Sequence, residues 1–141
     1  MLVTTLMLSL NSCSKDDNSD PTGNSVTMKV GGVEKTFNTV VVNQIPYEDY
    51  IDLIITASNN GSTTEFVTFG ISKDDIGAGH SWGFEYTLNG MLYSEGEAVS
   101  TVSSNATTNS DNKLIGTFSG TVTSSENVSL DLTQGSFDIT Y

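Results

Sequence analysis

Residues 84–94, FEYTLNGMLYS, predict the fold of this chain more directly than any other stretch. Apolar or aromatic residues recur at every second position before Asn89-Gly90, as expected for a strand with one buried face. Asn-Gly readily takes the positive backbone angles of a type I′ turn, which joins two antiparallel strands. We therefore predict a tight hairpin in which Tyr86 and Tyr93 are cross-strand neighbours.

The same two-residue period continues on both sides of this hairpin. Val26, Met28 and Val30 fall on one strand face, and Gly31-Gly32 after them is typical of a second two-residue turn. No stretch of ten residues keeps the 3.6-residue apolar period of a helix. Besides the two strands of the hairpin, we predict strands at residues 26–30, 33–37, 39–45, 51–57, 64–72, 98–103, 114–122, 128–133 and 137–141.

Two stretches between these strands are predicted as loops. They are residues 73–82, with room for one helical turn at 74–79, and the polar residues 104–112. Short strands with closely spaced turn signals are typical of sandwiches and barrels. The predicted fold is all-β, an antiparallel β-sandwich or partly open barrel of about 8–10 short strands.

The chain divides into three parts. Residues 1–12 contain an apolar run that is too short to span a bilayer, which needs roughly 20 apolar residues. Residues 13–24 form a polar, acidic linker after Cys13, and such a composition cannot bury a core. Residues 25–141 are predicted to form a single β-sandwich domain, a size that suits one hydrophobic core.

Cys13 is the only cysteine of the chain. The apolar run that precedes it, with the small residue Ser12, fits a removable secretory signal. No Lys or Arg precedes Cys13, so we expect a cationic beginning upstream of Met1.

Leu10-Asn11-Ser12-Cys13 resembles a lipobox, and Lys15-Asp16-Asp17 resembles the export tag of surface-exposed Bacteroidetes-type lipoproteins. The resemblance implies a lipid on Cys13 and attachment to the outer membrane, facing the cell surface. The alternative is a buried free cysteine.

Two further segments are similar to the same group of proteins. MKVGGVEKTF at residues 28–37 resembles the opening hairpin of small Bacteroidetes-type lipoproteins of unknown function. GTFSGT at residues 116–121, followed by TQGSFDI at 133–139, resembles their closing hairpin. The resemblance implies an all-β lipoprotein and supplies no catalytic residues.

The glycines of the closing segment have a physical interpretation of their own. Gly116 and Gly120 flank Phe118 on one strand face. Glycine in a strand leaves room for the close approach of another group. We expect an aromatic ring from a neighbouring strand, such as Phe137, to lie over these glycines.

The charge of the chain excludes several classes of partner. There are 17 acidic residues against five lysines and no arginine, which gives a formal charge of −12. Nucleic acid is excluded as a partner because binding to phosphates depends on Lys and Arg. Anionic lipid is equally unfavourable, so the acyl chains on Cys13 would have to hold the protein on the membrane. The absence of Arg also disfavours tight binding of carboxylate or phosphate ligands.

The sequence offers little for catalysis. His80 is the only histidine and is expected in an exposed loop. Glu95 and Glu97 share a strand face, as a glycosidase pair would, but solvated charge beside a turn explains them better. We predict that the protein is not an enzyme, with a small hydrolase centred on His80 as an alternative.

No metal or cofactor is expected. Zinc sites gather several His or Cys ligands, and this chain has one of each. The acidic groups at 74–75, 48–52 and 110–112 lack the spacing of a calcium-binding loop and are interpreted as solvated charge.

Aromatic residues provide the remaining hypothesis about function. Exposed rings on a β-sandwich stack on sugars, and Trp82, Tyr86 and Tyr93 are the possible ligand-binding residues, with Tyr47 and Tyr50 also available. Alternatively, the two hairpin tyrosines form an ordinary cross-strand pair and Trp82 fills the core. We predict a lipid-anchored cell-envelope protein with a non-enzymatic binding or structural display role. Its partners would be the outer membrane, through Cys13, and a glycan or an envelope protein. A carbohydrate-binding module is an alternative.

Overall fold

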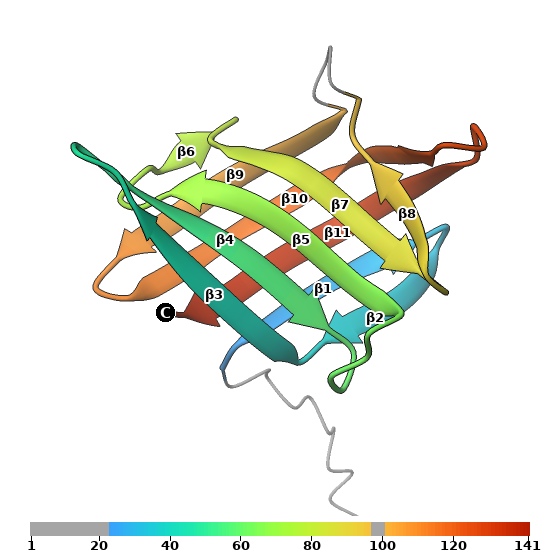
Figure 1. Cartoon of the computed structure of the whole chain (residues 1–141), viewed down its shortest axis with the longest axis horizontal. Coiled ribbons are helices and arrows are strands. Elements are labelled where there is room, and N and C mark those ends of the chain that lie inside the picture. Colours follow the sequence, from blue (N-terminus) through green and yellow to red (C-terminus); the bar gives the residue numbers. More distant parts are fainter. Residues whose placement is uncertain (1–22, 97–100) are drawn as a thin grey trace, which may run out of the picture.

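The computed structural model describes residues 23–96 and 101–141, and every regular element in these ranges is a β-strand (Figure 1). No helix in the described ranges is long and apolar enough to cross a membrane. Cys13 and Lys15-Asp16-Asp17 lie outside the described residues. The strands are β1 (Ser25–Val30), β2 (Val33–Phe37), β3 (Thr39–Pro46), β4 (Ile51–Ser58), β5 (Glu65–Ser72), β6 (Gly77–Ala78), β7 (Ser81–Leu88), β8 (Met91–Ser94), β9 (Val102–Ser110), β10 (Lys113–Ser124) and β11 (Ser129–Thr140).

The strands form one antiparallel sheet in the order β2-β1-β11-β10-β8-β7-β5-β4-β3, and this sheet folds back on itself. In Figure 1 the layer of β3, β4, β5 and β7 lies in front of the layer of β9, β10, β11 and β1, and their strands cross. The long strand β10 joins the layers, because residues 113–120 pair with β9 whereas residues 123–124 pair with β8. The ends of the path, β2 and β3, are linked by the single residue Asn38. The predicted all-β fold is confirmed as a nearly closed, barrel-like sheet.

Both predicted two-residue turns are present. Asn89 and Gly90 have φ angles of 52° and 78°, and Tyr86 pairs with Tyr93 across the hairpin. At the other turn the φ angles are 54° for Gly31 and 84° for Gly32. Positive φ at both central residues is the requirement of a type I′ turn, which explains why these dipeptides fix the register of their hairpins.

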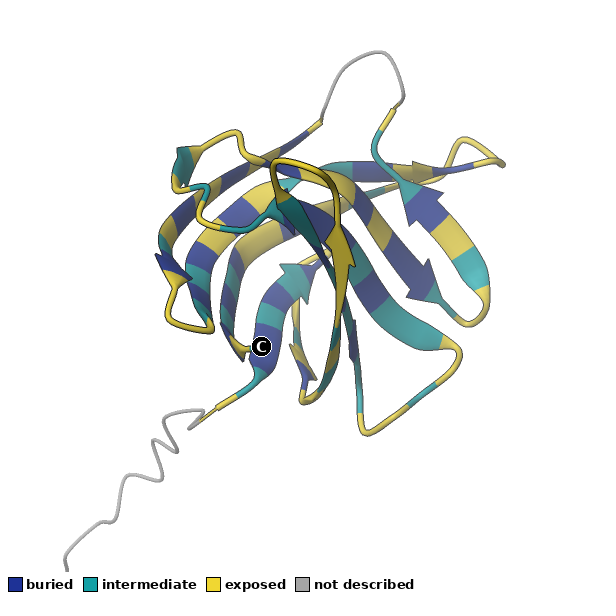
Figure 2. Cartoon of the chain, turned by 60° about the vertical axis from the view of Figure 1, so that its left-hand side comes forward, coloured by how far each residue is buried: buried dark blue, intermediate teal, exposed yellow. Residues whose placement is uncertain are grey.

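Four phenylalanine rings from the two layers form the centre of the core. Phe69 and Phe84 belong to β5 and β7, and Phe118 and Phe137 belong to β10 and β11. The ring centroids of Phe69 and Phe84 are 4.9 Å apart, those of Phe84 and Phe118 are 5.1 Å apart, and those of Phe69 and Phe137 are 5.2 Å apart. Figure 2 shows the alternation of buried and exposed residues along the strands that brings such side chains inside. We call this group the phenylalanine centre.

Glycines allow these rings to pack against the backbone. A Cβ atom at Gly116 would collide with the ring of Phe137, and one at Gly135 would lie 2.8 Å from ring atoms of Phe118. The expectation that an aromatic ring lies over Gly116 is therefore correct. It is wrong for Gly120, whose free space is taken by the backbone of Thr101.

The predicted loop at 104–112 is wrong, because β9 occupies residues 102–110. Its interior face consists of Val102, Ser104, Ala106 and, after a register shift, Asn109. The Asn109 side chain is 1% exposed and its amide nitrogen donates to the carbonyls of Ser72 and Asp75, at 2.8 and 3.0 Å. Only Val102 and Ala106 on this face are apolar, and the register shift interrupts the two-residue period, so the pattern could not indicate a strand.

Two other segments also differ from prediction. Residues 73–82 contain β6 and the start of β7 rather than a loop with a helical turn. The two strands predicted at 128–133 and 137–141 are the single strand β11, in which Gln134 has a φ angle of 51°. The pairing of β11 with β1 and β10 shifts register beside this residue, as at a β-bulge. A bulge lets one strand continue through residues that are typical of a turn.

Candidate binding site

Three hollows of several hundred Å³ open on the described part of the surface. The polar groove, of about 590 Å³, lies over β9, β10 and β11. The seam pocket, of about 490 Å³, lies where β7 of one layer approaches β9 of the other. The acidic corner, of about 650 Å³, lies between the β3–β4 connection and the residues after β5. The residues of each decide what it can bind.

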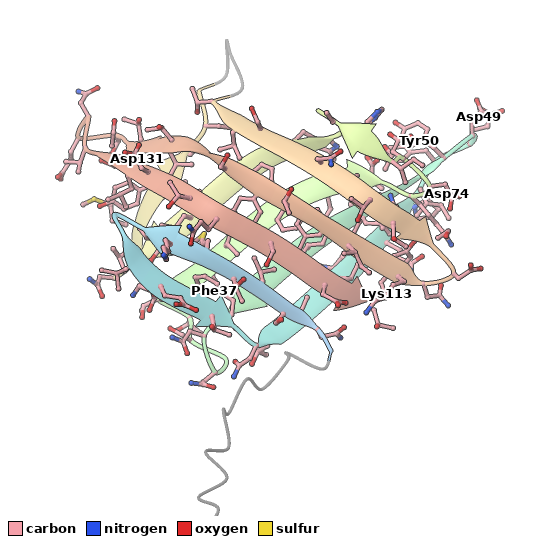
Figure 3. All side chains as sticks on the ribbon, turned by 180° about the vertical axis from the view of Figure 1, so that it is seen from behind. Phe37, Asp49, Tyr50, Asp74, Lys113 and Asp131 are labelled. Carbon is pink, nitrogen blue, oxygen red and sulfur yellow. The ribbon has the colours of Figure 1, made fainter. Side chains whose placement is uncertain are left out.

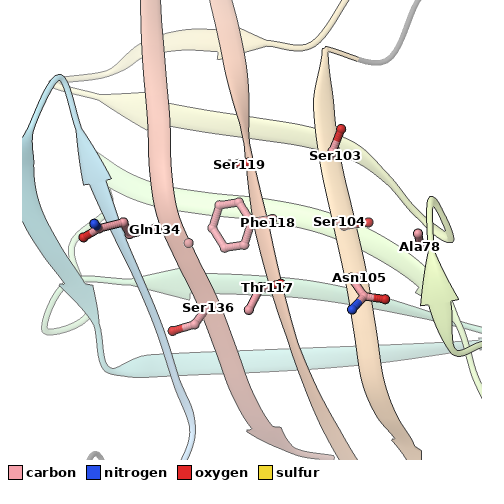
Figure 4. A pocket seen from close by; sticks show the side chains of 10 residues that line it. Ala78, Ser103, Ser104, Asn105, Thr117, Phe118, Ser119, Gln134 and Ser136 are labelled. Carbon is pink, nitrogen blue, oxygen red and sulfur yellow. The ribbon is translucent and has the colours of Figure 1, made fainter.

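The polar groove presents small uncharged side chains (Figure 4). Asn105, Thr117 and Ser136 are among them, and Phe118 contributes to its lining although this ring is 3% exposed. The Ser136 hydroxyl is already hydrogen-bonded to that of Thr27, at 2.8 Å. The groove therefore offers hydroxyl and amide groups without an exposed aromatic face or a charge that would orient a ligand.

The acidic corner gathers Asp49, Tyr50 and Asp74 at one end of the molecule (Figure 3). Tyr47 and Tyr50 stack there with ring centroids 4.7 Å apart, and both side chains are half-exposed. Across residues 23–96 and 101–141, no three His, Cys, Asp or Glu side chains are placed to hold a metal ion. The corner is an exposed acidic surface without a cation-binding arrangement.

His80 lies close to the acidic corner and is exposed. Its Nδ1 atom is 3.4 Å from the Oδ2 atom of Asp75, and both side chains are nearly half-exposed. Within the described part of the chain, no serine hydroxyl is hydrogen-bonded to His80, and the hydroxyl of the adjacent Ser81 has no partner. A histidine and an acid are therefore present, but the nucleophile that a hydrolase needs is not hydrogen-bonded to them.

The seam pocket contains two buried hydroxyl groups without partners. Ser81 at the start of β7 is 7% exposed and Ser104 of β9 is 6% exposed. Neither hydroxyl finds a hydrogen-bond partner in the described structure. A buried polar group left unpaired costs about 1–3 kcal/mol, so such groups are rare in folded proteins. Figure 4 shows the Ser104 hydroxyl directed from β9 toward Ala78, which lines the same pocket. Both side chains therefore keep a hydrogen-bonding capacity that the described protein atoms do not use.

Trp82 lines the same pocket and is 45% exposed. A β-bulge places it there: residues 68 and 70 of β5 pair with residues 85 and 82 of β7, so β7 carries one extra residue. Gly83 at the bulge has a φ angle of 64°. The bulge lets Trp82 and Gly83 both be exposed while Ser81 and Phe84 on either side of them are buried. Trp82 is therefore in a strand and at the surface, and the alternative that it fills the core is wrong.

The Trp82 ring lies over Gly70 of β5. A Cβ atom at Gly70 would come within 2.5 Å of the Cη2 and Cζ2 atoms of the indole. Gly70 is itself buried beneath this ring. The indole is thus held against the sheet on one side and is partly exposed to solvent, which makes a flat apolar platform at the rim of the seam pocket.

Tyr86 and Tyr93 do not belong to this platform. Tyr86 is fully buried and Tyr93 is 8% exposed, with ring centroids 6.4 Å apart. The Tyr86 hydroxyl donates to Oε1 of Glu65, at 3.0 Å, and Oε1 is also 2.8 Å from Nζ of Lys35. Burial, followed by the hydrogen bond to Glu65, raises the pKa of Tyr86 above its ordinary range. Both rings face the core, so Tyr86 and Tyr93 form the cross-strand pair given above as the alternative and are not an exposed surface for a sugar.

Sequence patterns predicted Trp82 as a possible ligand-binding residue and missed its surroundings. Ser81 is adjacent to Trp82, but nothing in the pattern indicates that its hydroxyl is buried. Ser104 lies in the polar stretch predicted as a loop. Glu95 also lines the pocket, where its Oε1 atom accepts a hydrogen bond from the backbone N–H of Phe84, at 2.9 Å. Its predicted companion Glu97 lies outside the described residues.

Comparison with protein-family models, curated proteins and solved structures finds no match for this chain.

Proposed function

We propose that this protein is a lipid-anchored, non-enzymatic binding protein of the bacterial cell envelope, displayed at the outer surface of the outer membrane. The lipid is attached to Cys13, and Lys15-Asp16-Asp17 directs the chain to the surface. Residues 14–24 connect this anchor to the domain. The binding site is the seam pocket.

The observation that carries this proposal is the placement of the pocket relative to the start of the domain. In Figure 1, β1 begins at the lower edge of the molecule, whereas β6 and the first residues of β7 and β9 lie at the upper edge. The seam pocket is built from that upper edge. A domain tethered through the residue before β1 therefore holds the pocket on the side away from its anchor.

Labelling with a fatty acid tests the anchor. The wild-type chain and Cys13→Ala are expressed from the native locus in the presence of a clickable palmitate analogue. Label is expected on the wild type and not on Cys13→Ala, because the cysteine thiol is the acceptor. Equal labelling of both chains would overturn lipidation at Cys13.

Protease digestion of intact cells tests display at the surface. The wild type is expected to be degraded, and the variant with Lys15, Asp16 and Asp17 all changed to Ala is expected to be protected at equal expression. A periplasmic protein serves as the control for cell integrity. Protection of the wild type would contradict surface display.

A further inference from the structure

We infer that the seam pocket binds a neutral saccharide, with one sugar ring stacked on Trp82 and its hydroxyl groups hydrogen-bonded to Ser81 and Ser104. This inference rests on the proposed binding role and names the class of ligand. It begins from the two unpartnered hydroxyls, because the seam pocket is lined by both Ser81 and Ser104, whereas the polar groove is lined by Ser104 alone and the acidic corner by neither.

The polar lining matches the hydrogen-bonding groups of a sugar. A serine hydroxyl donates one hydrogen bond and accepts others, and a sugar hydroxyl does the same. Ser81 and Ser104 come from β7 and β9 in opposite layers, and no element has to move for both to line one hollow. A ligand that supplies partners to both removes the cost of leaving them unpaired.

The apolar part of the pocket matches the C–H face of a sugar ring. The indole of Trp82 is flat, is held in place over Gly70, and is 45% exposed. Because Gly70 has no side chain, the ring rests directly on the sheet, so little rotational freedom is lost when a ligand stacks on it. Ligand sites generally combine such an aromatic surface with a few placed polar groups.

The charge of the lining argues for a neutral ligand. Among the described residues that line the pocket, Glu95 is the only charged one, and none is a lysine. One oxygen of Glu95 accepts the Phe84 backbone N–H. An acidic sugar would be repelled by this carboxylate, in a chain whose formal charge is −12.

Fluorescence provides a direct test because Trp82 is the only tryptophan. The purified full chain, in a detergent that carries no sugar headgroup, is titrated with neutral oligosaccharides of glucose, xylose, mannose and galactose. At least one neutral oligosaccharide is expected to change the tryptophan emission saturably, whereas oligogalacturonate is not. Saturable binding of oligogalacturonate alone, or of none of these probes, would overturn the inference.

Variants measured by calorimetry locate the site. Trp82→Ala and Gly70→Ala are each expected to weaken binding at least tenfold, the second because its methyl group displaces the indole. Ser81→Ala and Ser104→Ala are expected to weaken it severalfold. The control is Leu92→Ala on β8, which removes an exposed apolar side chain outside the pocket lining and should leave affinity unchanged.

Thermal unfolding of each variant shows whether it is folded at the temperature of the binding measurement. If Gly70→Ala does not fold, the affinities of Trp82→Ala and Trp82→Phe for the saccharide test the site instead. Trp82→Phe should retain part of the affinity, because its side chain is still aromatic. Unchanged binding by folded Trp82→Ala would overturn the inference. If the wild-type protein is lipidated and exposed on cells but binds none of these saccharides, this inference alone is overturned. The lipid anchor and the surface display are then unaffected.

Discussion

The phenylalanine centre and the seam pocket both lie where the two layers of the sheet meet, yet they are built in opposite ways. In the centre, four rings from both layers pack face to face or tilted, and glycines make room for them. In the seam pocket, two buried serines lack hydrogen-bond partners within the described structure and a hollow of about 490 Å³ remains. The difference teaches that the centre gains stability from close packing, whereas the seam contains buried polar groups that the described protein atoms leave unpaired.

The largest expected effect comes from the centre. Phe69→Ala removes a ring that contacts three other phenylalanines, so we expect the free energy of unfolding to fall by about 3–5 kcal/mol. Urea unfolding followed by circular dichroism measures it. Leu92→Ala, at an exposed position, serves as the control and should change stability by less than about 0.5 kcal/mol. A loss below about 1 kcal/mol for Phe69→Ala would mean that the centre does not dominate the core.

Asn109 gives an internal contrast, because it lies on the same strand as Ser104 and is also buried and polar. It donates to two backbone carbonyls, and its Oδ1 atom accepts from the hydroxyl of Tyr141, at 3.1 Å. Asn109→Ala leaves these groups unpaired, and a loss of about 1–3 kcal/mol is expected in the same unfolding assay. Asn105→Ala, on the exposed face of β9, is the matched control. Equal stability of the two variants would contradict a structural role for Asn109.

The contacts of Glu65 with Lys35 and Tyr86 make part of the stability of the fold dependent on pH. The hydrogen bond from Lys35, with a further one from Tyr86, holds the pKa of Glu65 below its usual value. A carboxyl group with a lowered pKa in the folded state stabilises the protein above its unfolded pKa, and this stabilisation is lost as the pH falls through the folded pKa. We expect Glu65→Gln to cost about 1 kcal/mol at pH 7, with the gap to the wild type closing below about pH 4.5. Unfolding curves at several pH values measure it, and a gap that does not depend on pH would refute this role.

The smallest expected effect is the sharpest test of the comparison. Ser104→Ala removes a buried hydroxyl that has no protein partner to lose, so the free energy of unfolding should change by less than about 0.5 kcal/mol, or rise slightly. The assay is the same, and Asn109→Ala shows what a bonded polar residue on β9 contributes. A loss above about 1 kcal/mol would show that the Ser104 hydroxyl supports the fold. The phenylalanine centre and the seam pocket would then both contribute to stability.

The hairpins could be predicted because local chemistry determines them. Asn89-Gly90 and Gly31-Gly32 set the turn geometry, and the strands beside them alternate clearly. The boundaries of β2 match the predicted 33–37, and β3 extends the predicted strand by one residue through Pro46. Strand β9 could not be predicted in the same way, since its buried side chains are mostly small or polar and their partners are distant in sequence.

The candidate site shows the same limit. Trp82 could be singled out because a lone tryptophan is conspicuous in any sequence. Its exposure depends on a bulge at Gly83 and on the absence of a side chain at Gly70, which no short motif encodes. Tyr86 and Tyr93 were correctly predicted to be neighbours, but which face of their hairpin is buried depends on how the two layers pack.

The position of β1 has a consequence for the way this chain matures. Strand β1 lies between β2 and β11, and Ser25 pairs with Asp138, so the first strand of the domain needs the last one. Pairings between such distant segments form slowly, and a growing chain emerges with its N-terminus first. The sheet cannot be completed while the ribosome is still making β11. In the export that we propose, the apolar segment before the domain would engage a secretion channel while the remainder is unfolded, and the sheet would close on the far side of the membrane.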